Sequence, residues 1–129
     1  MIVDTSALVA VVVREDGFEA VLDKLSAPPS APGIGAPTVV ELGIILSARL
    51  GRDARDLVAT LLYELDIAEV PFGEAHWREA VGAFWRYGRG RHPAALNFGD
   101  CLSYAVARLA DQPLLYVGDD FGATDILAA

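Results

Sequence analysis

Blocks of apolar residues, separated by polar and Gly- or Pro-rich stretches, predict alternating strands and helices along the chain. The first residues predict a short strand that ends at Asp4. The apolar run that follows is long for one strand, so it predicts a buried helix, capped by Ser6. Further short strands are expected at 34–36 and 67–71, and a continuously apolar strand, covered on both faces, at 114–117.

Polar residues in a recurring pattern predict where four helices begin. In a capping box, the side chain of the first residue accepts a hydrogen bond from the backbone N–H three residues later. The side chain of that later residue accepts one from the backbone N–H of the first. The pairs are Asp16 with Glu19, Thr38 with Glu41, Asp53 with Asp56, and Asn97 with Asp100. Residues 74–87 predict a further helix, on which Trp77 and Trp85 share a face that we expect to pack in the core.

The order of these elements predicts an α/β sandwich around a mostly parallel sheet. The chain of 129 residues contains no repeat and no long linker, so 1–129 is expected to form a single domain. Ligands of such sheets bind beyond the carboxyl ends of the strands. Asp4 and Asp119 each follow a predicted strand end, which is the first indication of a site.

Composition points to a protein of a reducing compartment. Cys101 is the single cysteine, so neither an intrachain disulfide nor a zinc finger can form, and the residue is expected to be a small buried hydrophobe. The N-terminus has no basic region typical of a secretory signal. The longest uncharged stretch, 25–40, is interrupted by four prolines. We therefore expect no membrane span and a soluble, cytoplasmic protein.

Charge argues against a general attraction to nucleic acid, since the formal net charge is −8. The segment WRYGRGRHP is an exception, because it gathers four basic side chains without an intervening acid: Arg86, Arg89, Arg91 and His92. This segment is either an ordinary solvated loop or a set of phosphate contacts.

Each acid near a predicted strand or helix end has a structural explanation, as a cap or a turn residue. Together the acids suggest more, because the predicted fold brings them to one edge of the sheet. The set comprises Asp4, Glu41, Asp100 and either Asp119 or Asp120. Close carboxylates repel one another and raise each other's pKa values, so a cluster persists most easily around a cation. Oxygen ligands without Cys or His favour Mg²⁺, with Mn²⁺ as a possible substitute.

Four stretches resemble the PIN domain and, more narrowly, the VapC ribonucleases of type II toxin–antitoxin pairs. They are IVDTSAL, VVELGI, GRGRHPAALNFGDCLSYA and LLYVGDDFGATDI. The resemblance spans nearly the whole chain in the same order and spacing. It implies a three-layer α/β/α sandwich with a sheet of four or five strands. It also implies a Mg²⁺-dependent endoribonuclease, inhibition by a VapB-type antitoxin, and a homodimer. Our hypothesis for the mechanism is that a metal-activated water attacks the scissile phosphate in line and leaves a 5′-phosphate and a 3′-hydroxyl.

The same resemblance assigns roles to individual residues. Asp4 and Asp100 match the principal metal ligands, and Glu41 matches the third acid of the site. Ser6 matches a small hydroxyl residue that orders water or Asp4. For the fourth acid, Asp119 is preferred because it is closer to the strand end, with Asp120 as the alternative. The loop that holds Arg86, Arg89, Arg91 and His92 becomes a candidate for RNA contacts, and Phe121 is expected to be structural.

Other functions fit the sequence less well. A receiver domain needs a lysine after a late strand, and the single lysine is Lys24, in an early helix. A phosphatase of the haloacid dehalogenase type needs an acid at the position of Ser6, and a 5′-nuclease acting on DNA needs additional elements. Two alternatives stay open. They are a PIN-like nuclease of RNA processing outside a toxin–antitoxin pair, and a catalytically inactive PIN-like binding module.

Overall fold

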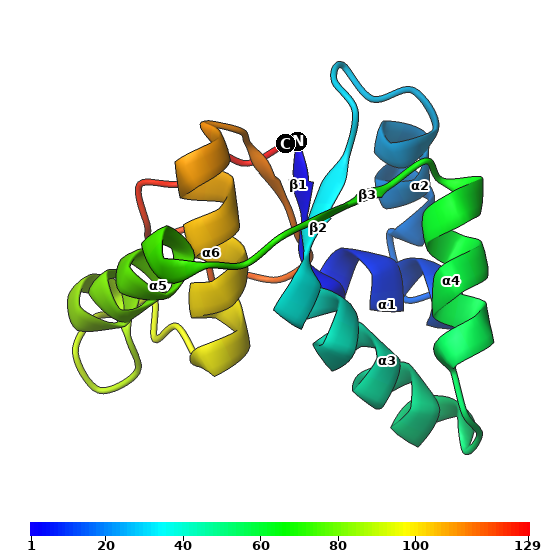
Figure 1. Cartoon of the computed structure of the whole chain (residues 1–129), viewed down its shortest axis with the longest axis horizontal. Helices are drawn as coiled ribbons and strands as arrows, with labels where there is room; N and C mark the ends of the chain where they lie inside the picture. Colours follow the sequence, from blue (N-terminus) through cyan, green and yellow to red (C-terminus); the bar gives the residue numbers. More distant parts are fainter.

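The computed structural model describes residues 1–129, which fold around a parallel sheet of four strands (Figure 1). The strands are β1 (Ile2–Val3), β2 (Gly33–Gly35), β3 (Ala68–Val70) and β4 (Leu114–Leu115). Their order in the sheet is β3-β2-β1-β4, and every neighbouring pair is parallel. The predicted parallel sheet is confirmed, although β3 and β4 are shorter than expected.

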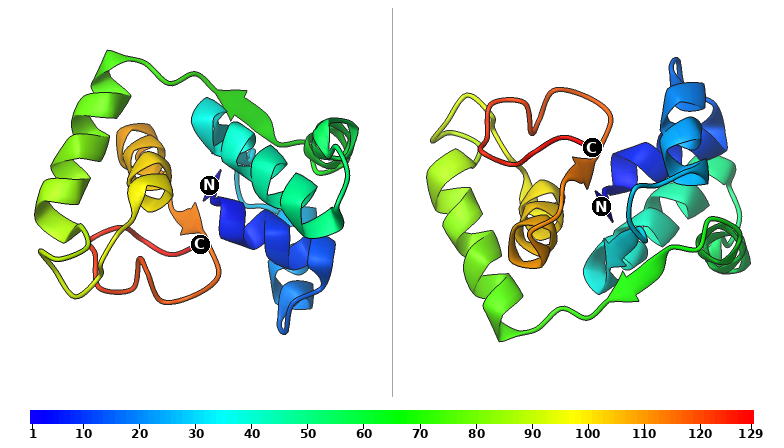
Figure 2. Two further views of the ribbon diagram at one scale, coloured as in Figure 1. Left: turned by 90° about the horizontal axis from the view of Figure 1, so that it is seen from below. Right: turned by 90° about the horizontal axis from the view of Figure 1, so that it is seen from above.

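Six helices cover the two faces of this sheet. They are α1 (Thr5–Val13), α2 (Phe18–Ser26), α3 (Ala36–Leu50), α4 (Arg55–Glu64), α5 (Glu74–Tyr87) and α6 (Phe98–Ala110). The first four helices lie on one side of the sheet, and α5 and α6 lie on the other (Figures 1 and 2). The expected three-layer α/β/α sandwich is therefore confirmed. None of the helices combines the length and the apolar character that a membrane crossing requires.

The alternation of side chains along β1 divides the core into two. Met1 and Val3 pack in the cluster beneath α1–α4, and Ile2 packs in the cluster beneath α5 and α6. Successive strand residues point to opposite faces, so the short central strand contributes to both clusters. Helix α6 is the most deeply placed helix, because every residue from Gly99 to Ala107 is buried.

The predicted orientation of α5 is wrong. Trp77 and Trp85 share a face as expected, but they are 48% and 69% exposed. The buried residues of α5 are instead Ala80 and Ala83, which belong to the cluster that contains α6. Small residues at this contact allow the two helices to approach closely, and the tryptophans are left on the outer face.

Helix starts agree with the predictions at one position and differ at others. Asn97 and Asp100 form the expected capping box of α6. Helix α1 is capped by Asp4 rather than by Ser6, which lies in the first turn. Helix α2 begins after Gly17 without a side-chain cap, so the box of Asp16 and Glu19 does not form.

The same applies to the next two helices. Helix α3 begins at Ala36 with a proline in its first turn, so Thr38 is inside the helix, where its hydroxyl lies 3.4 Å from that of Ser103. Helix α4 begins after Ala54, without a side-chain cap. Asp53 instead forms an ion pair with Arg55. Proline at the start of a helix was the stronger signal at α3, because proline lacks the N–H that the first turn leaves unpaired.

Candidate active site

The site lies where the strand order reverses, at the carboxyl ends of β1 and β4. Strand β1 has β2 on one side and β4, the last strand of the chain, on the other. The backbone N–H of Asp4 donates to the carbonyl oxygen of Leu115 at 2.9 Å, and this bond extends the pairing of the two strands by one residue. Such a switch point leaves a crevice in which ligands of open α/β sheets bind.

Asp4 is held in a fixed orientation at this point. Its carboxylate oxygen Oδ2 accepts hydrogen bonds from the backbone N–H of Ser6 at 2.9 Å and from the Ser6 hydroxyl at 2.6 Å. The hydroxyl oxygen in turn accepts from the backbone N–H of Val117 at 3.0 Å, beyond the end of β4. Asp4 is 5% exposed. The two hydrogen bonds from Ser6 show that Ser6 positions Asp4, as predicted. The second carboxylate oxygen, Oδ1, makes no hydrogen bond within the protein.

Asp100 is the third residue of α6 and completes its capping box. Its Oδ2 accepts from the backbone N–H of Asn97 at 2.8 Å, and the Asn97 side chain accepts from the Asp100 N–H at 2.9 Å. Burial raises the pKa of Asp100 to about 6, although the Asn97 hydrogen bond opposes this; the charges of Asp120, Asp4 and Glu41 add to the increase. These four carboxylates therefore share one electrostatic environment.

Glu41 approaches the N-terminus of α6 from α3. The hydroxyl of Thr5 donates to Glu41 Oε2 at 2.6 Å. The Glu41 carboxylate also lies against Gly99, so closely that a methyl group at this position would overlap it. Glycine here is required by close approach, and the partial positive charge of the helix N-terminus favours the carboxylate. Sequence reasoning missed the contributions of both Thr5 and Gly99, since neither shows a periodic or charged signal.

The fourth acid at the site is Asp120. It lines the same pocket as Asp4, Glu41 and Asp100, whereas Asp119 does not. The preference for Asp119 from its nearness to the strand end is thus corrected. Strand β4 ends early, and Gly118 adopts a φ of 105°. The carbonyl oxygen of Asp119 then accepts from the backbone N–H of Gly122 at 3.0 Å, which makes Asp119 the first residue of a turn.

The pocket has a volume of about 270 Å³, and its polar lining consists of oxygen donors with a single basic side chain. No three Asp, Glu, His or Cys side chains are placed to ligate one metal ion together. Mg²⁺ does not need such a group, because it keeps several waters and takes one or two protein carboxylates directly. Cys101 follows Asp100 in the sequence but does not line this pocket, and burial raises the pKa of its thiol to about 11. The donor set fits a hard cation.

The basic residues of the 86–92 segment are mostly engaged within the protein. Arg86 donates to Glu79 at 2.6 Å, and Arg91 stacks over the Trp85 ring at 3.7 Å. His92 accepts a hydrogen bond at Nδ1 from the backbone of Ala94. None of the four side chains, Arg86, Arg89, Arg91 and His92, lines the acid pocket. Their proposed contact with RNA stays a prediction. Among the four, Arg89 is exposed and its side chain makes no hydrogen bond or ion pair within the protein.

The chain matches the family model of the PIN domain over residues 1–127. The chain belongs to the PIN domain family. It is 47% identical over 126 residues to Ribonuclease VapC36 of Mycobacterium tuberculosis, covering 98% of this chain and 91% of the relative. It is also 36% identical to Ribonuclease VapC of Mycolicibacterium smegmatis, covering 99% of this chain and 98% of the relative. This PIN domain is thus of the VapC type, as the sequence motifs predicted.

Two solved structures share the fold of this PIN domain at 18% sequence identity. One is the crystal structure of VapC20 of Mycobacterium tuberculosis, described as a sarcin–ricin loop cleaving toxin, with a TM-score of 0.80 over 99% of this chain and 97% of that chain. The other is a toxin–antitoxin complex from Klebsiella pneumoniae, with a TM-score of 0.71 over 99% of this chain and 95% of that chain.

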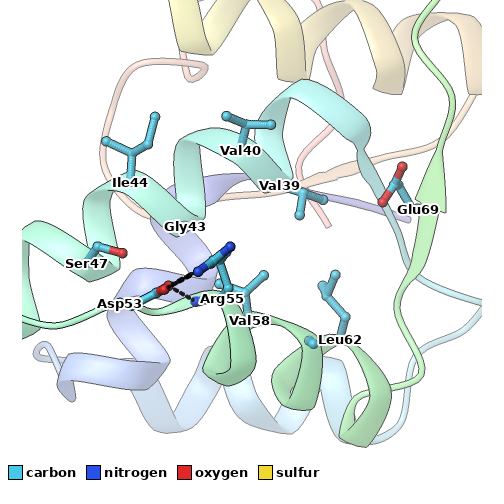
Figure 3. Close-up of a pocket in the computed structure, with 11 residues that line it drawn as sticks. Val39, Val40, Gly43, Ile44, Ser47, Asp53, Arg55, Val58, Leu62 and Glu69 are labelled. Carbon is cyan, nitrogen blue, oxygen red and sulfur yellow. Dashed lines mark hydrogen bonds and ion pairs between the residues drawn. The ribbon is translucent and has the colours of Figure 1, made fainter.

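This PIN domain also has an apolar groove between α3 and α4, with a volume of about 730 Å³. Val39 of α3 and Leu62 of α4 point toward one another across it, and the Asp53–Arg55 ion pair and Glu69 lie at its margins (Figure 3). Ile44, which is on α3 and also lines the groove, is 65% exposed.

A second apolar hollow, of about 280 Å³, lies between α5 and α6 on the other side of the molecule. Its lining is entirely apolar: Ala80, Val81, Phe84, Phe98, Cys101 and Leu102. Phe98 belongs to this lining and is also 81% exposed, so most of its side chain projects into solvent. The same surface therefore carries both a projection and a hollow.

Proposed function

We propose that this PIN domain is a Mg²⁺-dependent endoribonuclease and the toxin of a type II toxin–antitoxin pair. In this role it hydrolyses RNA phosphodiester bonds and arrests growth until a VapB-type antitoxin binds it. The observation that carries the proposal is the convergence of four acids on one pocket, in a chain that resembles VapC ribonucleases along nearly its whole length. The acids are Asp4, Glu41, Asp100 and Asp120.

Asp4 and Asp100 are the residues proposed to hold the metal ion. Each has one oxygen engaged in the hydrogen bonds that fix its orientation and a second oxygen free of protein partners. Ser6 and Asn97 thus position the two carboxylates before any ligand binds, which reduces the reorganisation that binding requires. Ser6 acts through Asp4 and is a positioning residue.

Glu41, on α3, and Asp120, in the loop after β4, complete the proposed site. Glu41 is fixed by the Thr5 hydroxyl, so it can hold and orient a water without moving. Asp120 lies in the loop after β4 and is proposed to accept hydrogen bonds from water at the same place. When bound, Mg²⁺ would offset the charge on the scissile phosphate and lower the pKa of a coordinated water. The products expected are a 5′-phosphate and a 3′-hydroxyl.

Substitution of Asp4 tests the proposal. Asp4→Asn keeps an oxygen that can accept the Ser6 hydrogen bonds but removes the charge, so we expect a folded protein with at least about a hundredfold lower cleavage of single-stranded RNA in magnesium. Asp111→Asn is a matched control, because Asp111 is exposed at the end of α6 with a φ of 51°, which asparagine tolerates. Induced expression of wild type, but not of Asp4→Asn, should arrest growth. A folded Asp4→Asn protein that cleaves RNA normally would refute the proposal.

The groove between α3 and α4 is the surface proposed for the antitoxin. Its surface is mostly apolar and lies between two helices, which suits one face of an amphipathic helix. The net charge of −8 favours a basic partner, and Glu69 at the margin of the groove adds to this locally. Because α3 carries Glu41 to the acid pocket on its opposite side, an antitoxin that grips this helix is close to the site it must block.

The hollow between α5 and α6 is the surface proposed for the homodimer. A two-fold contact brings the same patch of both protomers together, so the patch must be complementary to itself. Phe98 projects beside a hollow of apolar lining, and two copies related by a two-fold axis can exchange these side chains. The groove between α3 and α4 is a separate surface with a lining of its own, so it stays available to a different partner.

A further inference from the structure

We infer that Arg49 forms a phosphate subsite beside the acid pocket, which Glu15 occupies until RNA binds. The inference rests on the proposed ribonuclease function. It concerns the last turn of α3 and the residues just after α1, which line the pocket together with the four acids.

The pocket is so strongly acidic that an RNA ligand needs a cationic side chain nearby in order to bind. Five carboxylates line the pocket, and Arg49 is the single basic residue among them. With one Mg²⁺ bound, the lining would still be net negative, whereas each phosphodiester of RNA carries a negative charge. An anionic ligand approaching such a pocket is repelled unless a positive group lies on its path. Arg49 is the residue in the pocket lining that meets the requirement.

The position of Arg49 on α3 indicates which phosphate it contacts. Glu41, Ile45 and Arg49 are spaced by four residues and form one stripe, and all three line the pocket. Arg49 lies eight residues beyond Glu41, about 12 Å along the helix axis, and its long side chain leans back toward the start of the helix. It therefore contacts a phosphate that flanks the scissile one, and its role is in binding and positioning rather than in the chemical step.

The present partner of Arg49 is weakly held. One guanidinium nitrogen lies 3.4 Å from Glu15 Oε1, and the side chains of Arg49 and Glu15 are 53% and 39% exposed. Arg49 makes no other side-chain hydrogen bond in the structure. Exposed ion pairs of this kind contribute little to stability, whereas a phosphate can accept two parallel hydrogen bonds from a guanidinium. RNA can therefore displace Glu15 from Arg49.

Cleavage kinetics on a short single-stranded RNA of mixed sequence test the subsite. Arg49→Ala should raise KM about fivefold to tenfold with kcat within about twofold, and Arg49→Lys should recover part of this loss. The dependence of log KM on log salt should become shallower by about 0.7, the value for one lost phosphate contact with a single strand. Arg52→Ala is the matched control, because Arg52 is exposed just after α3 and does not line the pocket.

Two further measurements separate the subsite from a structural role. Calorimetric titration with magnesium chloride, without RNA, should show binding by Arg49→Ala that is no weaker than in wild type, since a positive charge has been removed. Weaker magnesium binding would mean a distorted pocket and would overturn the inference. Glu15→Gln leaves Arg49 free and should lower KM by about twofold to fivefold. An unchanged KM in Glu15→Gln would overturn the competition between Glu15 and RNA.

The outcomes also distinguish this inference from the proposed function. If wild type cleaves RNA in magnesium but Arg49→Ala behaves as Arg52→Ala does, the subsite is refuted and the ribonuclease function stands. If wild type cleaves no RNA in magnesium, both are refuted.

Discussion

Asp100 combines a structural role with a proposed metal-binding role, and the two place different demands on its carboxyl group. The capping hydrogen bond from Asn97 favours the ionised form, while burial and three nearby carboxylates raise the pKa of Asp100 to about 6. An unfolded chain would titrate this group near 3.8. Its contribution to stability is therefore full below about pH 4 and is lost as the pH rises through about 6. Above that pH the metal-free fold carries an unfavourable charge.

Replacement of Asp100 by asparagine should accordingly stabilise the metal-free protein. Asp100→Asn keeps an acceptor for the Asn97 N–H and removes the buried charge, so we expect the free energy of unfolding at pH 8 to rise by about 1 to 3 kcal/mol in EDTA. The difference should disappear below about pH 4, where the carboxyl group is protonated in both states. In millimolar magnesium, wild type should gain stability and the variant should gain less. Urea unfolding measures the free energy of unfolding under all three conditions, which are EDTA at pH 8, a pH below about 4, and millimolar magnesium. A variant less stable than wild type in EDTA at pH 8 would contradict the prediction.

Gly99 allows a second residue-scale prediction about the site. A methyl group at this position overlaps the Glu41 carboxylate, so Gly99→Ala should displace Glu41 and break its hydrogen bond with Thr5. We expect kcat for RNA cleavage to fall by about tenfold to a hundredfold while the protein stays folded, because alanine is the better helix former. Gly82→Ala is the control, since a methyl group there meets no atom within 4 Å. Normal activity of Gly99→Ala would show that Glu41 needs no fixed position.

Elements differ in how much of their geometry the sequence reveals. The start of α6 was predictable, because Asn97 and Asp100 satisfy both halves of a capping box within four residues. The starts of α2 and α3 were not, because Asp16 and Thr38 fit the same local pattern without capping either helix. For Thr38, tertiary packing decides: the residue is buried against Ser103 of α6.

Periodicity has a similar limit on α5. The spacing of Trp77 and Trp85 predicts that they share a face, and it contains no information on whether that face is turned inward. The packing of α5 against α6 decides which face of α5 is buried. Helix α6 is almost completely buried, and the α5 residues that pack against it are the small residues Ala80 and Ala83. Sequence reasoning about one helix cannot include that constraint.

The two faces of α3 permit a prediction about the antitoxin. Ile44 lines the groove and is largely exposed, so Ile44→Asp should weaken the complex with the proposed VapB-type antitoxin by at least about thirtyfold. RNA cleavage should be unchanged, because Ile44 does not line the acid pocket. Co-expression should then fail to relieve growth arrest. Tyr63→Asp, an exposed position of α4 outside the groove, is the control, and equal affinity of both variants would remove the groove as the docking surface.

At the scale of the whole molecule, the sheet order explains why acids distant in the sequence meet. A parallel sheet places the residues after its strands on one edge, and this rule predicted the convergence of Asp4, Glu41 and Asp100 from sequence. The choice between Asp119 and Asp120 depended on a turn at Gly118 that no strand rule describes. Arg49 and Glu15 were not predicted either, because their approach to the pocket depends on how α1 packs against α3.

The hollow between α5 and α6 gives the prediction that concerns the assembled molecule. If two copies meet there, each Phe98 enters the hollow of its partner, so one substitution removes two contacts from a single interface. Phe98→Asp places an acid in the first turn of α6, where the helix dipole favours it, and the fold should be kept. Sedimentation equilibrium should show a wild-type dimer and a monomeric variant. Leu127→Asp, at a position that is 74% exposed and lies outside the hollow, should remain dimeric. A dimeric Phe98→Asp protein would place the two-fold contact elsewhere.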